Sequence, residues 1–76
     1  NTFGIFPNPT NGKLVVTKES GTNSFRVINV SGEVVYTTML LEETNPLDLS
    51  FLPAGIYVAE LTAANGHKVL RKIVRQ

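Results

Sequence analysis

Residues 47–63 read LDLSFLPAGIYVAELTA and contain two strand patterns joined by a corner. Leu47, Asp48 and Leu49 alternate between apolar and polar, as in a short half-buried strand. Residues 50–55 include Ser, Pro and Gly, which favour tight turns. Residues 56–63 then form the longest uninterrupted strand pattern in the chain. We therefore predict a strand, a sharp corner and a longer strand, with the other segments packed around them.

The corner has a Leu-x-x-Gly-x-Tyr pattern formed by Leu52, Gly55 and Tyr57. This pattern resembles the tyrosine corner of immunoglobulin-like sandwiches, in which the Tyr hydroxyl bonds to upstream backbone. Alternation places Tyr57 with Ala59, Leu61 and Ala63 on an uncharged strand face, so we expect that face to point inward. Ile56 and Val58 then face outward or lie under a neighbouring element. Asp48 is expected to cap or brace the corner.

Five further segments have strand patterns, and turn-forming residues separate them. Ser31-Gly32 predicts a two-residue hairpin, and Asn65-Gly66 predicts a type I′ turn. Residues 42–46 predict a polar loop, with Pro46 at a strand start or a sheet edge. Residues 67–76 also fit a helical spacing, but they follow a hairpin signal and lack a helix cap, so we predict a strand. The predicted strands span residues 2–6, 13–18, 24–30, 33–41, 47–49, 56–63 and 67–76.

These patterns predict an all-β fold, an immunoglobulin-like antiparallel β-sandwich of about seven short strands. The side chains expected to form its core are Leu14, Val16, Phe25, Val27, Val35, Leu49, Leu52, Tyr57, Ala59 and Leu61.

Length and composition limit the possible functions. The 76 residues predict a single domain spanning residues 1–76, which we expect to be part of a longer protein. No apolar run approaches the length of a transmembrane helix, and the lack of Cys excludes disulfides and Cys-based metal sites. The single His67 and the scattered acidic residues indicate no catalytic residues, no metal site and no cofactor. A net charge of +1 without an aromatic row argues against nucleic-acid binding.

Several short motifs occur in a specific order along residues 6–76. They are PNPTNG at residues 7–12, a Gly32 hairpin, the corner with Gly55 and Tyr57, and the basic-apolar end RKIVRQ at residues 71–76. In this order and spacing, they resemble the C-terminal sorting domain of the type IX secretion system of Bacteroidetes.

The resemblance implies a signal that other proteins read, with no chemistry of its own. A cargo protein attached at the N-terminal side would cross the periplasm and be directed by this domain to the type IX translocon and its shuttle components. A sortase-like peptidase would then remove the domain at or before Asn1, and the cargo would be secreted or held at the outer-membrane surface. The family motif falls on Pro7, Asn8, Pro9, Gly12, Gly55, Tyr57, Lys72, Ile73, Val74 and Gln76, with Gln76 as the natural end.

Each motif also has a purely structural interpretation. Pro7, Pro9 and Gly12 fit a rigid turn, and Gly55 and Tyr57 fit backbone geometry and core packing. The last strand carries Lys68, Arg71, Lys72 and Arg75, so we expect its edge to bind a translocon component by strand addition and charge. The same charges could instead only discourage edge pairing. The alternative function is a fibronectin-like spacer, adhesion or carbohydrate-binding module of a surface protein.

Overall fold

The computed structural model describes residues 3–18, 21 and 23–76, and it is all-β within them. The predicted strand start at Thr2 and most of the turn predicted over residues 19–23 lie outside the described residues. Seven strands follow one another along the chain: β1 (Phe3–Phe6), β2 (Lys13–Lys18), β3 (Asn23–Ile28), β4 (Val34–Leu40), β5 (Thr44–Asp48), β6 (Gly55–Thr62) and β7 (Lys68–Arg75). The predicted fold class, an all-β sandwich, is therefore confirmed.

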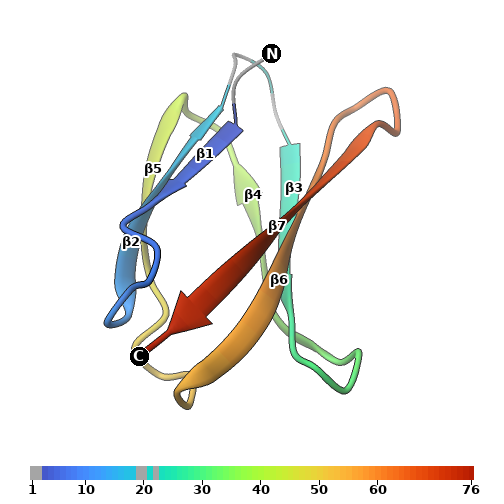
Figure 1. Cartoon of the computed structure of the whole chain (residues 1–76). Coiled ribbons are helices and arrows are strands. Elements are labelled where there is room, and N and C mark those ends of the chain that lie inside the picture. Colours follow the sequence, from blue (N-terminus) through green and yellow to red (C-terminus); the bar gives the residue numbers. More distant parts are fainter. Residues whose placement is uncertain (1–2, 19–20, 22) are drawn as a thin grey trace.

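The strands form two antiparallel sheets that face each other (Figure 1). One sheet has the strand order β1-β2-β5, and the other has the order β4-β3-β6-β7. The long β6 pairs with β7 from Gly55↔Arg75 to Thr62↔Lys68, which confirms the terminal strand and excludes the helical alternative. Both β4 and β7 are edge strands of the larger sheet.

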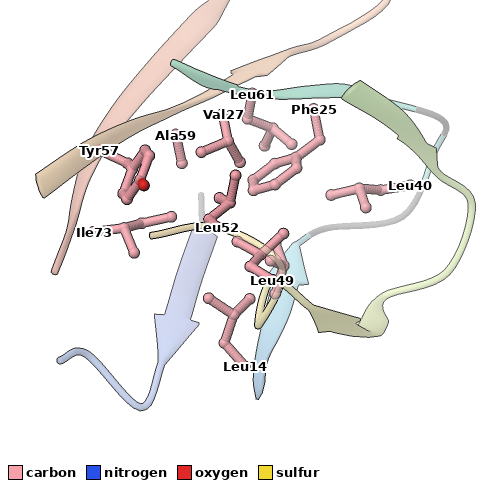
Figure 2. Packing of buried hydrophobic residues seen from close by; sticks show 11 residues of the cluster. Leu14, Phe25, Val27, Leu40, Leu49, Leu52, Tyr57, Ala59, Leu61 and Ile73 are labelled. Atoms are coloured by element: carbon pink, nitrogen blue, oxygen red, sulfur yellow. The ribbon is translucent and has the colours of Figure 1, made fainter. Parts of the chain in front are cut away.

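The core lies between the sheets and contains side chains from both (Figure 2). Every predicted core residue is buried except Val35, which is half-buried and packs against the cluster. Leu40 and Ile73 are also buried, although the sequence did not single them out for the core. Ile73 lies opposite Tyr57 in the β6–β7 register, so both side chains point to the same side of the sheet. The inward face predicted from Tyr57, Ala59 and Leu61 is confirmed.

Both predicted hairpins form, but their predicted two-residue loops are wrong, because each loop has three residues. The Asn29 N–H donates to the Glu33 carbonyl at 2.9 Å, and the Ala63 N–H donates to the His67 carbonyl at 2.9 Å. Gly32 and Gly66 occupy the last loop position with φ of 87° and 88°. A type I′ turn would need positive φ at Asn65 as well, and no described non-glycine residue has it. These loops are instead three-residue turns that end in a left-handed glycine.

The polar loop predicted over residues 42–46 is also too long. Asn45 and Pro46 belong to β5, where they pair with Val16 and Val15 of β2. Asn45 is buried, and its Nδ2 donates to the Glu42 carbonyl at 2.8 Å. Pro46 is tolerated because β5 is an edge strand, as the sequence predicted for this residue.

Candidate functional site

Three motif segments that are distant in sequence meet at one end of the sandwich. They are the loop between β1 and β2, the corner between β5 and β6, and the end of β7. Figure 1 shows the C-terminus close to the start of β6 and to the β1–β2 loop. We call this arrangement the end cluster and define it as residues 7–12, 48–57 and 72–76.

Asn8 connects the β1–β2 loop to β7 through its side-chain amide. The Asn8 Nδ2 donates to the Lys72 carbonyl at 2.7 Å, and the Val74 N–H donates to the Asn8 Oδ1 at 3.0 Å. The carboxamide thus supplies one donor and one acceptor to the β7 edge, as a peptide group of an adjacent strand would.

Thr10 continues this contact through its backbone. The Thr10 N–H donates to the Val74 carbonyl at 2.8 Å, and the Gln76 N–H donates to the Thr10 carbonyl at 2.8 Å. Thr10 is fully buried, and its hydroxyl donates to the Lys13 carbonyl while accepting from the Gly12 N–H. Residues 8–10, which we call the capping segment, therefore cover the outer edge of β7 over its last residues.

The capping segment changes the interpretation of the terminal strand. We expected a partner to add a strand along the basic edge of β7. Over residues 72–76, that edge already bonds to Asn8 and Thr10, so strand addition there would require the capping segment to leave. The expected strand addition is therefore wrong for this stretch of the folded chain.

Gly12 allows the β1–β2 loop to pack closely against the corner. A Cβ atom at Gly12 would lie 2.8 Å from the Ser50 Cα, and the φ of 130° is one that other residues rarely adopt. The Gly12 carbonyl accepts from the Leu49 N–H at 2.7 Å. Gly12 therefore meets a packing and conformational requirement that no other residue type meets.

Tyr57 forms the tyrosine corner that the sequence predicted. Its ring is buried, and its hydroxyl donates to the Pro53 carbonyl at 2.6 Å. Gly55 opens β6 in a nearly extended conformation, and a Cβ atom there would meet only the Tyr57 ring, at an ordinary 3.9 Å. Tyr57 thus fixes the shape of the corner, whereas space alone does not require glycine at position 55.

Asp48 braces the same corner. The Ser50 N–H donates to the Asp48 Oδ1 at 3.0 Å. Hydrogen bonds from the Ser50 side chain and backbone lower the pKa of Asp48, and the charges of Lys13 and Arg75 lower it further. Arg75 in turn donates from Nη2 to the Ser50 carbonyl at 3.1 Å. The last strand is thereby tied to the corner as well as to the capping segment.

The four motif residues of the last strand have different environments. Lys72 and Gln76 are exposed, Val74 is half-buried, and Ile73 is 1% exposed and belongs to the core. Pro7, Asn8 and Pro9 are exposed on the same end of the molecule. The structure thus brings Asn8 together with Lys72 and Val74, and Gly12 together with the corner, but it leaves Ile73 buried in the core.

The other basic residues of β7 have intramolecular contacts. The Arg71 guanidinium lies over the Phe3 ring, 5.3 Å from its centroid. Lys68 Nζ lies 3.9 Å from Glu60 Oε2, and Arg26 Nε lies 2.8 Å from Glu60 Oε1. Glu60 therefore forms ion pairs with Arg26 and Lys68 on the outer face of the larger sheet.

Two contacts of the end cluster could not be read from the sequence. The bonds of Asn8 to β7 join residues more than sixty positions apart, and only the turn chemistry around Asn8 marks it as special. Thr10 was missed altogether, although a Thr next to Asn-Gly can bond local backbone.

Within the part of the chain that the structure describes, no group of three or more His, Asp or Glu residues could hold a metal ion. The described residues also include no helix long and apolar enough to span a membrane.

A family model provides an independent comparison. The model described as "Secretion system C-terminal sorting domain" matches residues 4–76, nearly the whole chain. No curated protein matches the chain. The family is not a family of enzymes; it is typical of Bacteroidetes and implies a protein that is secreted or displayed at the cell surface. The resemblance inferred from residues 7–12, the corner and the terminal residues is thus confirmed, and the chain belongs to the family of secretion system C-terminal sorting domains, the signals of type IX secretion.

Proposed function

We propose that the type IX translocon and its shuttle components read this domain in its folded state, and that they contact the end cluster. A cargo protein attached at the N-terminal side would be carried through the outer membrane. A sortase-like peptidase would then remove the domain, and the cargo would be released or anchored at the surface.

One observation carries this proposal: two separate motif segments form a single surface. Four hydrogen bonds connect the capping segment to Lys72, Val74 and Gln76. A partner that contacts exposed Lys72 and Gln76 therefore also meets exposed Pro7 and Pro9. Since this surface exists only in the folded chain, recognition of the end cluster would distinguish a folded signal from an unfolded one.

Export of a reporter tests the proposal. A periplasmic signal peptide, a fluorescent protein and this chain would be fused and expressed in a type IX-competent bacterium and in its translocon-null sibling. We expect extracellular or surface fluorescence only in the competent strain. Reporter that stays in the periplasm of both strains, with the domain folded, would support the spacer or adhesion module instead.

Two substitutions on the same strand face locate the recognised surface. Lys72 lies in the end cluster, whereas Lys68 lies four residues away at the opposite end of β7. Both substitutions remove one positive charge from an exposed side chain. We expect Lys72→Gln to reduce export, because Lys72 belongs to the end cluster, and Lys68→Gln to leave export unchanged. Equal export of the two variants would argue against recognition at the end cluster.

A further inference from the structure

Edge strands expose unpaired N–H and C=O groups, so folded proteins usually protect them against pairing with other chains. Three of the four edge strands described here are protected. β1 has only four residues and is followed by Pro7 and Pro9. β5 contains Pro46, and β7 carries basic side chains and the capping segment.

β4 is the exception. Its seven residues, VVYTTML, contain no charge, Pro or Gly. Among the described strands it pairs only with β3, and the register shift between Val27 and Ile28 affects only the start of β4. The remainder, residues 36–40, is a regular strand with an open edge.

The hydrogen-bonding pattern identifies the groups at that edge. The Asn29 N–H donates to the Glu33 carbonyl, so Asn29 directs its backbone groups toward the β4 side. Backbone direction alternates along a strand, and therefore Val27 and Phe25 of β3 also direct their N–H and C=O groups toward β4. Tyr36 and Thr38 oppose these residues, and therefore Thr37 and Met39 direct their N–H and C=O groups away from the sheet. Thr37 and Met39 are both exposed.

The charges beside β4 determine which kind of strand it could accept. Glu33 precedes β4, and Glu42 and Glu43 follow it, so acidic residues flank an uncharged stretch. If two copies paired antiparallel about Thr37, Glu33 of one copy would approach Glu42 of the other, and the like charges would repel. A segment with basic residues at its ends would instead be attracted.

Two hollows adjoin the same end of β4. One measures about 480 Å³, and Leu41, Glu42 and Glu43 contribute to its lining. The other measures about 280 Å³ and is lined by Met39, Thr62 and Ala63. Two acidic side chains line the first hollow, so it would suit a basic side chain, and Met39 and Ala63 line the second, which would suit a small apolar one.

We propose that the open edge of β4 binds an extended segment of a partner protein by strand addition, and that this segment has an uncharged β-forming stretch flanked by basic residues. The outward backbone groups of Thr37 and Met39 would pair with the segment, and the acidic flanks would fix its position. This surface is separate from the end cluster, so it would leave the capping segment in place.

A synthetic peptide with alternating Val and Thr and a Lys at each end serves as the probe. Titrated into the isotope-labelled chain, it should shift the amide signals of Thr37 and Met39 and slow their hydrogen exchange. A matched peptide with Glu at each end should bind more weakly at low salt, and added salt should reduce the difference. No binding, equal binding of both peptides, or slower exchange confined to β7 would overturn the proposal.

Two proline variants provide the control. Thr37→Pro removes an outward N–H from β4 and should weaken peptide binding about tenfold, which corresponds to about 1.4 kcal/mol. Leu70→Pro changes an exposed edge residue of β7 and should leave the affinity unchanged. If Thr37→Pro does not fold, Thr37→Lys places a charge on the same edge and should also weaken binding. Self-association of the chain through Thr37, in place of peptide binding, would also contradict the proposal.

Discussion

Asn8 is the residue whose replacement most directly tests how the capping segment is held. Asn8→Ala removes both side-chain hydrogen bonds to β7, the 2.7 Å bond to the Lys72 carbonyl and the 3.0 Å bond from the Val74 N–H. The backbone bonds of Thr10 remain possible. The substitution therefore weakens the contact between the capping segment and β7 without altering the core.

Both hydrogen bonds are exposed, so in Asn8→Ala water can bond to the Lys72 carbonyl and the Val74 N–H and offset part of the lost stability. A neutral hydrogen bond contributes about 0.5–1.5 kcal/mol net, and at an exposed position we use the lower half of this range. Together, the two bonds should stabilise the contact by about 1–2 kcal/mol. The Val74 amide hydrogen should then exchange roughly 5–30 times faster in the variant. The Gln76 amide should follow, because it bonds to Thr10 in the same segment.

Native-state hydrogen exchange by NMR measures these rates residue by residue. Asn65→Ala is the matched control, because Asn65 accepts a 2.9 Å bond from the His67 N–H in an exposed turn at the other end of β6. It should leave the exchange of Val74 and Gln76 unchanged. If Asn8→Ala also leaves both rates unchanged, the Asn8 amide does not hold the segment in place.

Three further substitutions test the core and the corner. Tyr57→Phe removes the hydroxyl bond to the Pro53 carbonyl and should lower the free energy of unfolding by about 1–2 kcal/mol in chemical denaturation. Ile73→Ala should lower it by about 2–5 kcal/mol, because Ile73 is fully buried; a loss below 1 kcal/mol would place this side chain outside the core. The pKa of Asp48 is lowered in the folded state. The stabilisation that the Asp48 carboxylate gives to the folded chain should therefore be present above about pH 4 and be lost as the pH falls further. Asp48→Asn should flatten that part of the stability–pH curve, and an unchanged curve would argue against the Ser50 bonds.

The sequence predicted those parts of the fold that depend on local patterns. Alternation identified the strands and the inward side chains of Phe25, Val27 and Leu61, and the corner pattern predicted the hydroxyl bond of Tyr57. The sequence analysis assigned Ile73 to the sorting motif, because the terminal residues 71–76 resemble the end of the family's domain. Its burial depends on its position opposite Tyr57, which only the β6–β7 register shows.

The parts that could not be predicted depend on contacts between distant residues. Asn-Gly favours a hairpin, but whether the loop has two or three residues depends on how Ala63 and His67 pair. Likewise, the Asn8 side chain could have formed hydrogen bonds with the backbone of its own turn. It bonds to β7 because the packing of the two sheets places β7 beside it. The motif residues thus predicted a family, whereas the structure assigned several of them to the stability of one surface.

We propose that the type IX machinery reads the folded end cluster together with the terminal residues. To test this, residues 74–76 would be removed from the reporter fusion, and export would be compared with the circular dichroism of the truncated domain. We predict that export is lost while most of the β-sheet signal remains, because the core depends on Ile73 and not on Val74 to Gln76. Undiminished export, or export that falls only in step with unfolding, would show that the terminal residues are not recognised.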